Sequence, residues 1–290
     1  MEIKNVSFIG LGVMGYPMAG YLQKNQLKVS VYNRTLYKAE KWVSEYGGKL
    51  FQTPGECVKN SDAIFICVGK DEDLRDVMES SNGILKNAKE GAIIVDHTTS
   101  SANIAREFSK KCKNINIFFL DAPISGGQAG AENGQLSIMV GGDKVAFNKI
   151  KSVLSNYGKA IELIGKSGTG QLTKMINQIC IAGLVQGLSE ALAFGKKSNL
   201  DMEKVLKVIS KGAAQSWQME NRYRTMLDGK FDYGFAVDWM RKDLSYCFNE
   251  AKKNGSKLPI TEIVDQYYKK IQDSGGERSD TSSLITLVDK

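Results

Sequence analysis

The sequence holds a single histidine, His97, among its 290 residues. A metal site built on several histidines is therefore excluded, and so is a cysteine–histidine relay away from that position. The five cysteines are odd in number and no two are spaced as C-x-x-C, which argues against a disulfide framework and a zinc site. Free cysteines within apolar runs are typical of a reducing compartment, so we expect a cytoplasmic protein without a bound metal.

Proline is also scarce, with four in the whole chain, and no Pro- or Ser-rich linker separates its halves. Long apolar runs are absent as well: residues 179–194, the longest, contain Gln186, Ser189 and Glu190, too many interruptions for a membrane span. The first residues carry no basic segment followed by an apolar one, so we expect no signal peptide.

No block of five basic residues occurs, although 39 Lys and Arg against 32 Asp and Glu give a net charge of +7. The surplus is spread in pairs such as Lys252-Lys253, which we interpret as solvated helix faces. A nucleic-acid binder would need a clustered basic face with interleaved aromatics, so we expect neither nucleic acid nor membrane as a partner. A modest positive charge suits an anionic small molecule.

Short apolar segments alternate with helical patterns in the first half of the chain, and most are continuous runs, as in a parallel sheet buried on both faces. We therefore expect an α/β domain over residues 1–164 and an all-helical domain for substrate binding and dimerisation over 165–290. The expected strands are 6–10, 28–32, 63–68, 92–96, 117–121, 136–141 and 161–164. Helical segments are expected at 56–60 and 71–85, and then at 168–197, 201–211, 215–228, 236–254 and 259–273.

A glycine loop follows the first strand, in the order Gly10-x-Gly12-x-x-Gly15. Gly10 would allow the tight turn, Gly12 would let the backbone approach a pyrophosphate, and Gly15 would permit close helix–strand packing. An amphipathic helix and a second strand follow, which predicts a Rossmann-type dinucleotide site that includes Leu11, Val13 and Met14. FAD and S-adenosylmethionine proteins share parts of the pattern.

The second strand ends in Asn33, Arg34 and Thr35, where an acidic residue would favour NAD by binding the ribose 2′-hydroxyl. An arginine with two neutral hydrogen-bonding neighbours would accept a 2′-phosphate instead. We therefore expect NADP, with NAD still possible. The alternative interpretation is that Arg34 is a solvated loop residue.

Three further stretches complete a pattern across the whole chain: "DAPISGGQAGAENGQLSIMVGG" at 121–142, "GTGQLTKMINQ" at 168–178 and "RKDL" at 241–244. With the glycine loop and the tail "SDTSSL", the sequence resembles the β-hydroxyacid dehydrogenase family. That family includes 3-hydroxyisobutyrate dehydrogenase, tartronate semialdehyde reductase and NADPH-dependent glyoxylate/succinic semialdehyde reductases. The resemblance implies a Rossmann-type N-terminal domain and an all-α C-terminal domain, with the active site in the cleft between them.

The resemblance also implies roles for residues that match the family's motifs. Lys174 would be the catalytic acid/base, because hydride transfer to an aldehyde leaves an alkoxide that must receive a proton. Asn177 and Gln178 share its helix face and would orient it or the substrate. The alternative is that Lys174 lies near the helix end and only extends its ammonium group to water. The other implied contacts are Val68 and Thr99 along the nicotinamide, Ser125, Gly126 and Gly127 on the substrate carboxylate, and Phe235, Lys242 and Asp243 closing the site.

Some positions leave the substrate open among small β- or γ-hydroxy acids and their semialdehydes. Many family members carry Asn where this chain has Gln178, which resembles the tartronate semialdehyde reductases, whereas "NRT" at 33–35 resembles the glyoxylate reductases. Trp217 either caps the substrate pocket or belongs to the core, and His97 is interpreted as structural. Imine reductases and non-catalytic cofactor-binding modules of the same architecture are the alternatives, and Lys174 argues against both. We expect a homodimer or homotetramer.

Overall fold

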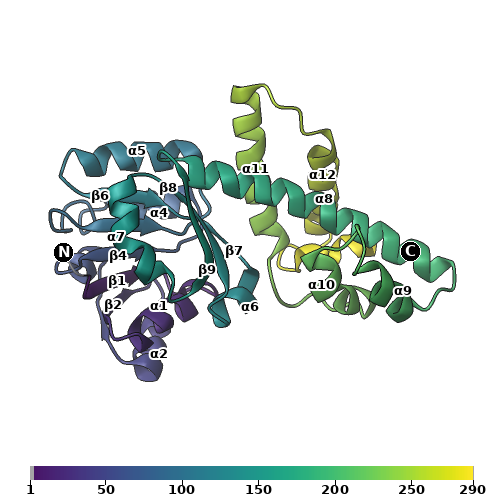
Figure 1. Cartoon of the computed structure of the whole chain (residues 1–290), viewed down its shortest axis with the longest axis horizontal. Coiled ribbons are helices and arrows are strands. Elements are labelled where there is room, and N and C mark those ends of the chain that lie inside the picture. The colour runs from purple at the N-terminus through teal and green to yellow at the C-terminus, as the bar shows by residue number, and fades with distance from the viewer. Residues whose placement is uncertain (1–2, 290) are drawn as a thin grey trace. The chain divides into compact units, whose positions relative to one another are not determined.

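The computed structural model describes residues 3–289. The chain divides into two compact units, Met1–Lys174 (unit 1) and Met175–Lys290 (unit 2), each of which is described by itself. The division falls within one long helix, α8 (Thr169–Lys197), while the last strand ends at Gly165. Figure 1 shows the helices and strands with the labels used below.

Unit 1 is built on one sheet of nine strands, in the order β3-β2-β1-β4-β5-β6-β8-β7, with β9 beside β8. The strands β1 to β6 pair in parallel, whereas β8 is antiparallel to both β6 and β7. The prediction of a wholly parallel sheet is therefore wrong at this end. The strands are β1 (Asn5–Ile9), β2 (Lys28–Tyr32), β3 (Lys49–Leu50), β4 (Ala63–Ile66), β5 (Ile93–Asp96), β6 (Phe118–Asp121), β7 (Ile124–Ser125), β8 (Leu136–Gly141) and β9 (Gly158–Gly165).

Helices lie on both sides of this sheet (Figure 1), and three of them, α3, α5 and α7, begin at a residue whose side chain caps the helix. Ser101 and Asp143 each accept a hydrogen bond from a backbone N–H three residues later, while Thr53 does so ahead of a proline. The helices of unit 1 are α1 (Gly15–Lys24), α2 (Leu36–Tyr46), α3 (Pro54–Val58), α4 (Asp71–Glu79), α5 (Ala102–Lys113), α6 (Gly127–Glu132) and α7 (Lys144–Leu154), followed by the start of α8.

The core of unit 1 has two layers, one on each face of the sheet. In β4, Phe65 packs in the cluster that contains Trp42 of α2, and its neighbour Ile66 packs in the cluster that contains Phe108 of α5. Successive side chains of a strand point to opposite faces. Both faces of the central strands are covered, which explains why their sequences are continuously apolar.

Unit 2 is helical, and among the described residues no strand occurs after Gly165; only an isolated bridge joins Ala236 and Asp280. The predicted all-helical second half is confirmed. After α8 come α9 (Met202–Ile209), α10 (Trp217–Leu227), α11 (Val237–Asn254), α12 (Pro259–Asp273) and a short 3₁₀-helix, η1 (Thr281–Leu287), which was not predicted. Leu192 of α8, Leu206 of α9 and Met226 of α10 share one core cluster.

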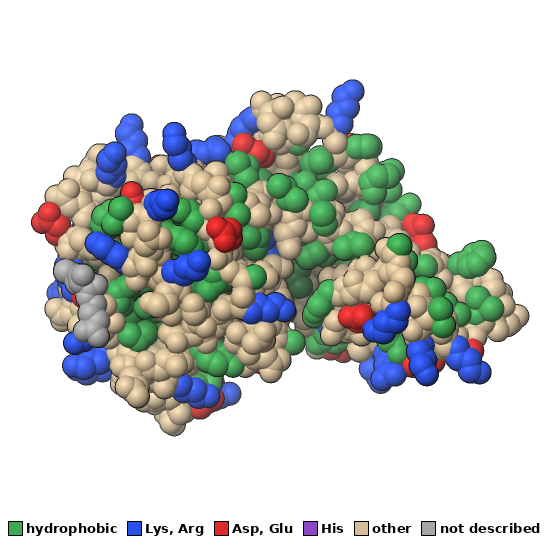
Figure 2. All heavy atoms as spheres, in the orientation of Figure 1, with side chains coloured by type: hydrophobic (Ala, Val, Ile, Leu, Met, Phe, Trp, Pro, Cys, Tyr) green, Lys and Arg blue, Asp and Glu red, His purple; other side chains and the backbone are tan. Residues whose placement is uncertain are grey.

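The helix α8 has the length and apolar composition of a membrane span, but half of its most apolar window is buried inside the structure. That burial is typical of the core helix of a folded domain. Its outer face keeps apolar side chains, with Ile176 63%, Leu184 45% and Phe194 72% exposed. Figure 2 shows apolar side chains on the surface of the helical unit.

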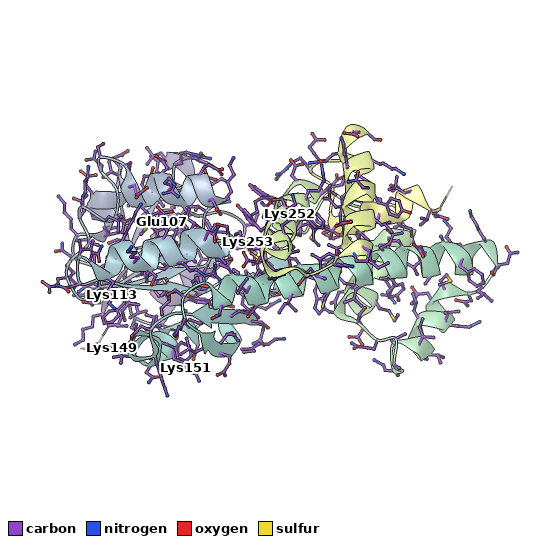
Figure 3. The ribbon with its side chains drawn as sticks, turned by 90° about the horizontal axis from the view of Figure 1, so that it is seen from above. Glu107, Lys113, Lys149, Lys151, Lys252 and Lys253 are labelled. Carbon is purple, nitrogen blue, oxygen red and sulfur yellow. The ribbon has the colours of Figure 1, made fainter. Side chains whose placement is uncertain are left out.

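The basic surplus is distributed over helix surfaces. Figure 3 labels Lys149 and Lys151 on α7 and Lys252 and Lys253 on α11, and all four are exposed. Lys149 lies 5.7 Å from the ring centre of Phe118. The interpretation of the pair Lys252-Lys253 as a solvated helix face is confirmed.

Candidate active site

The glycine loop lies at the carboxyl edge of the sheet, where the strand order reverses between β1 and β4. Gly10 has a φ of +97°, and a Cβ there would lie 2.3 Å from the Cys67 oxygen; a Cβ on Gly15 would lie 2.0 Å from the Gly10 oxygen. A Cβ on Gly12 would meet no atom within 4 Å, so that backbone is open to a ligand. Gly10 and Gly15 thus stand where the tight turn and the close packing require glycine, and the open backbone at Gly12 leaves room for the pyrophosphate of a dinucleotide.

Of the other loop residues, Val13 is 60% exposed and Met14 is half-buried, whereas the Leu11 side chain is buried in the core. The Leu11 N–H donates to Asn33 Oδ1 at 2.8 Å, and Asn33 Nδ2 donates to the Thr35 oxygen at 2.9 Å. Asn33 therefore ties the end of β2 to the glycine loop. Its predicted contact with the cofactor stays a prediction beside these two contacts with the backbone.

Arg34 follows Asn33 with its side chain 82% exposed, and it pairs with Asp73 of α4 at 3.0 Å. An exposed ion pair of this kind contributes little to stability. Its partner can therefore be exchanged for an incoming phosphate at small cost. Thr35 is exposed at the start of α2.

The loops after β4 and β5 are joined by hydrogen bonds. The Val68 N–H donates to Thr98 Oγ1 at 3.1 Å, and the Thr98 N–H donates to Asp96 Oδ1 at 3.0 Å. Thr99, between two buried neighbours, is half-buried. Both residues expected along the nicotinamide, Val68 and Thr99, thus lie on connected loops at the same sheet edge as the glycine loop.

Lys174 stands in the second turn of α8 and is 7% exposed. The start of that helix, which belongs to unit 1, is held at the end of β6 by Asp121, whose carboxylate accepts hydrogen bonds from the N–H groups of Gly168 at 2.7 Å and Gln171 at 3.0 Å. Gln171 is fully buried and bonds in turn to the loop after β5. The lysine is therefore held at the carboxyl edge, where ligands of open α/β sheets bind.

Two buried aspartates end neighbouring strands, since Asp96 of β5 and Asp121 of β6 are register partners. Burial raises the pKa of Asp96 to about 7, and the nearby Asp121 adds to this shift. Burial also raises the pKa of Asp121 to about 6, while backbone N–H groups from the start of α8 act in the opposite direction. Close carboxyl groups of this kind are common at functional sites.

His97 is buried behind this edge and contacts two groups. Its Nδ1 lies 2.6 Å from the Ala122 oxygen and its Nε2 lies 2.8 Å from the Tyr157 hydroxyl. Since a carbonyl can only accept, Nδ1 carries the proton and Nε2 accepts from Tyr157. Burial lowers the pKa of His97 to about 4, so the ring is neutral at pH 7. These contacts support the interpretation of His97 as a structural residue.

The turn from β7 into α6 holds three predicted residues: Ser125 ends β7, Gly126 follows it, and Gly127 begins α6. Ser125 is half-buried, while Gly126 and Gly127 have φ angles of +137° and +61°. A Cβ on Gly127 would meet no atom within 4 Å. The positive φ angles favour glycine at both positions, and the space beside Gly127 is open, while the carboxylate site stays a prediction.

In unit 2, a hydrogen bond between Gln178 and Asp243 joins α8 to α11. Both side chains are 2% exposed. Gln178 Nε2 donates to Asp243 Oδ2 at 2.6 Å, and Gln178 Oε1 accepts from Asn177 Nδ2 at 2.8 Å. The Lys242 ammonium lies 3.1 Å from Asp243 Oδ1. Four residues that were predicted for the site thus lie together: Asn177, Gln178, Lys242 and Asp243. The positive charge of Lys242 is compensated by the carboxylate of Asp243.

Two further predicted residues of unit 2, Trp217 and Phe235, have other neighbours. Trp217 starts α10 and is 44% exposed, with the Arg222 guanidinium 4.8 Å from its ring centre, so the core alternative is wrong. Phe235 is half-buried, and its N–H donates to Asp280 Oδ2 at 2.8 Å. Among residues 3–289 no group of His, Cys, Asp and Glu could hold a metal ion.

Gln171 and the two strand-end aspartates, Asp96 and Asp121, were not predicted as site residues. Gln171 stands in "GTGQLTK" and resembles any polar residue in a first helical turn. A signal for the aspartates was present, because two apolar strands end in the same acidic residue, "IIVD" and "FFLD". Charged residues at the carboxyl end of a buried strand are candidates for a site.

Comparison with known families decides the assignment. Residues 5–165 match the NAD binding domain of 6-phosphogluconate dehydrogenase, and residues 168–288 match the family described as "NAD-binding of NADP-dependent 3-hydroxyisobutyrate dehydrogenase". The chain belongs to the β-hydroxyacid dehydrogenase family. It is therefore an NAD(P)-dependent oxidoreductase of this family, and the predicted family and fold class are confirmed.

Individual relatives span the whole chain. An uncharacterised oxidoreductase of Shewanella frigidimarina is 57% identical and covers 98% of both chains. The 2-hydroxy-3-oxopropionate reductase of Escherichia coli is 33% identical over 98% of this chain and 97% of its own. Among solved structures, the 3-hydroxyisobutyrate dehydrogenase of Salmonella typhimurium is 26% identical, with a TM-score of 0.87 over 98% of this chain and 99% of its own.

Proposed function

We propose that this β-hydroxyacid dehydrogenase is an NADP-dependent reductase of a small semialdehyde that carries a carboxylate, and that Lys174 is its general acid. The observation that carries the proposal is the buried position of Lys174 (7% exposed) at the carboxyl edge of a dinucleotide-binding sheet. A lysine is rarely buried without a specific reason. The name of the Escherichia coli relative, 2-hydroxy-3-oxopropionate reductase, describes a substrate of this class.

The proposed chemistry assigns distinct tasks to the chain's residues. The cofactor, when bound, supplies a hydride to the carbonyl carbon. Lys174 holds a proton on Nζ and donates it to the carbonyl oxygen, which becomes the hydroxyl of the product; in the oxidative direction the neutral amine takes the proton back. The open backbone at Gly12 and the closely packed Gly10 and Gly15 would hold the pyrophosphate.

The preference for NADP is supported by the end of β2. An acidic residue at this point would repel a 2′-phosphate, and Arg34 stands there with its side chain 82% exposed. A phosphate would compete with Asp73 for the guanidinium, and a bidentate arginine–phosphate pair is the stronger of the two interactions.

The carboxylate of the substrate would be held by Ser125 with the backbone of Gly126 and Gly127. Both glycines have positive φ and no side chain, and successive backbone N–H groups in a turn of this kind can bind an anion. The Ser125 hydroxyl would add one donor. This arrangement would fix the aldehyde in a single orientation, which is the main requirement for productive hydride transfer.

We also propose a homodimer or homotetramer. The exposed apolar side chains of α8, Ile176, Leu184 and Phe194, support this assembly, because a large exposed apolar face is typical of an interaction surface. Sedimentation analysis of the purified protein tests it, and a monomer at micromolar concentration would refute it.

Oxidation of NADPH in the presence of a panel of aldehydes and imines tests the enzymatic proposal. The panel contains tartronate semialdehyde, methylmalonate semialdehyde, succinic semialdehyde, glyoxylate and two cyclic imines. We expect turnover with at least one of the four carboxylate-bearing aldehydes and none with the imines. Turnover of imines alone, or of no compound by a protein that binds NADPH, would contradict the proposal.

A further inference from the structure

Gln171 connects the helix of Lys174 to the loop after β5. It lies in the first turn of α8, three residues before Lys174, and is fully buried. Its Oε1 accepts a hydrogen bond from the Ser100 N–H at 3.1 Å, and its Nε2 donates to the Thr98 oxygen at 2.7 Å. Both ends of the amide are thus bound to the backbone of one short loop.

Asp121 holds the same helix end from the neighbouring strand. One carboxylate oxygen accepts from the Gly168 N–H and the other from the Gln171 N–H. The helix start lies so close to the strands that a Cβ on Gly170 would be 2.5 Å from the Asp121 and Met139 oxygens. A carboxylate at a helix N-terminus is also favoured by the helix dipole. Little freedom remains for this turn to shift.

The loop bound by Gln171 carries the residues expected along the cofactor. The Thr98 hydroxyl accepts a hydrogen bond from the Val68 N–H. Thr99 lies between Thr98 and Ser100, the two residues to which the Gln171 side chain is hydrogen-bonded. One side chain therefore links the position of Lys174 to the positions of Val68 and Thr99. An error of about 1 Å between reacting groups can lower a rate about 10²-fold.

We infer that Gln171 is a positioning residue, which sets the distance between Lys174 and the loop at residues 98–100. The inference rests on the proposed role of Lys174 as the general acid. The Gln171 amide does not itself exchange protons, and all its hydrogen bonds go to the protein backbone. Its contribution is to hold the lysine where the carbonyl oxygen of the substrate will lie.

The first test replaces Gln171 by Met, which keeps the volume and removes both hydrogen bonds. We expect kcat for the semialdehyde to fall about 10- to 100-fold, while the Kd for NADPH of the folded protein changes less than about threefold. The matched control is Thr173→Val, which removes a hydroxyl that bonds only to the Thr169 oxygen of the same helix. A kcat of Gln171→Met equal to that of the control would overturn the inference.

The second variant, Gln171→Glu, gives a signature that a purely structural role would not produce. A neutral glutamic acid can accept from Ser100 and donate to the Thr98 oxygen, whereas a carboxylate would face that oxygen without a proton. Burial and the nearby Asp96 and Asp121 favour the neutral form of the new acid. We expect the ratio of its kcat to the wild-type kcat to rise at least about fivefold between pH 8 and pH 6; a constant ratio contradicts the inference.

A third readout needs no turnover. Acetylation of Lys174 by acetic anhydride is followed by mass spectrometry in the protein without cofactor, with the exposed Lys252 as an internal reference. We expect Lys174 to react at least about fivefold faster in Gln171→Met than in wild type or Thr173→Val. An unchanged rate would contradict the positioning role. If the wild type reduced no aldehyde but the rate still rose, the proposed function would fail while the positioning of Lys174 by Gln171 would stand.

Discussion

Asn33 Oδ1 accepts a hydrogen bond from the Leu11 N–H at 2.8 Å, which joins the end of β2 to the glycine loop. The same amide donates to the Thr35 oxygen at 2.9 Å, so one side chain fixes both segments that would surround a dinucleotide. Asn33 was predicted from its place beside Arg34, as a ligand of the cofactor. Its two contacts also show how the shape of the loop is maintained.

Replacing Asn33 by Ala should therefore weaken the binding of either dinucleotide. Two lost hydrogen bonds cost about 1–2 kcal/mol, so we expect the Kd for NADPH and for NADH to rise about 5- to 30-fold, measured by nucleotide fluorescence. Asn25→Ala is the control, because that amide bonds only to the Tyr21 oxygen of its own helix. Equal affinities of Asn33→Ala and the control would show that the loop keeps its shape unaided.

Arg34 should determine the choice between NADP and NAD. We expect Arg34→Asp to reverse a wild-type preference for NADP, because the arginine–phosphate interaction contributes about 1.5–3 kcal/mol, or roughly 10- to 150-fold in kcat/KM. Asp73→Asn removes the residue that pairs with Arg34 and should increase the preference for NADP. Steady-state kinetics with both cofactors measure these ratios, and equal kcat/KM values in the wild type would refute the assignment.

Lys174→Ala should lower kcat by at least about 10²-fold, since general acid–base catalysis contributes roughly 10²–10⁴. The Kd for NADPH should stay nearly unchanged. Lys174→Arg should be equally inactive, because a guanidinium does not release its proton near neutral pH. Lys252→Ala, at an exposed position of α11, serves as the control for loss of one positive charge. Near-normal turnover of either Lys174 variant would remove the lysine from the mechanism.

The parts of the fold that were predicted correctly are those governed by local pattern. The segments 28–32 and 136–141 became β2 and β8 with the predicted ends. The two-residue strands β3 and β7 have no detectable pattern, and the antiparallel direction of β8 depends on the reversal of the chain over residues 126–135, which apolar periodicity does not encode.

The same distinction applies to the site. The glycine loop was recognised because all its requirements lie within six residues, and backbone geometry dictates each glycine. The bonds from Gln171 to Ser100 and from Asp121 to Gly168 join segments 71 and 47 residues apart in the sequence. No local preference specifies such a pair, since it arises only when the strands have been placed side by side.

Asp96 should make the stability of the protein depend on pH. Its pKa is raised from 3.8 to about 7 by burial, so the folded state holds this proton more tightly than the unfolded state. The resulting stabilisation is complete below about pH 4 and is lost as the pH rises through 7, with an upper limit of about 4 kcal/mol. We expect the free energy of unfolding of the wild type, relative to Asp96→Asn, to fall between pH 5 and pH 8.

Urea denaturation at several pH values measures this difference. His97 acts in the opposite direction, because its pKa is lowered to about 4 and its stabilisation is lost as the pH falls from 6.5 to 4. Since His97 is present in both proteins, its contribution cancels in the comparison. Parallel curves for wild type and Asp96→Asn would show that Asp96 has an ordinary pKa.

The last prediction concerns recognition of the substrate carboxylate. Ser125 and the two positive-φ glycines after it would hold the anion through one hydroxyl and backbone N–H groups. A neutral aldehyde of equal length loses those contacts and leaves the donors unpaired, a difference of about 2–4 kcal/mol. We therefore expect kcat/KM for succinic semialdehyde to exceed that for butanal by roughly 30- to 1000-fold, and methylmalonate semialdehyde to exceed isobutyraldehyde similarly.

A variant of Ser125 and a matched control test whether the Ser125 hydroxyl binds the substrate carboxylate. Ser125→Ala should reduce the difference between the charged and neutral aldehydes while leaving butanal reduction within about twofold, because only the charged substrate uses the hydroxyl. Ser155→Ala is the control, since that hydroxyl bonds to the Lys151 oxygen on the outside of α7. If the neutral aldehyde is reduced as efficiently in both pairs, residues 125–127 bind no carboxylate and the glycines serve only the turn into α6.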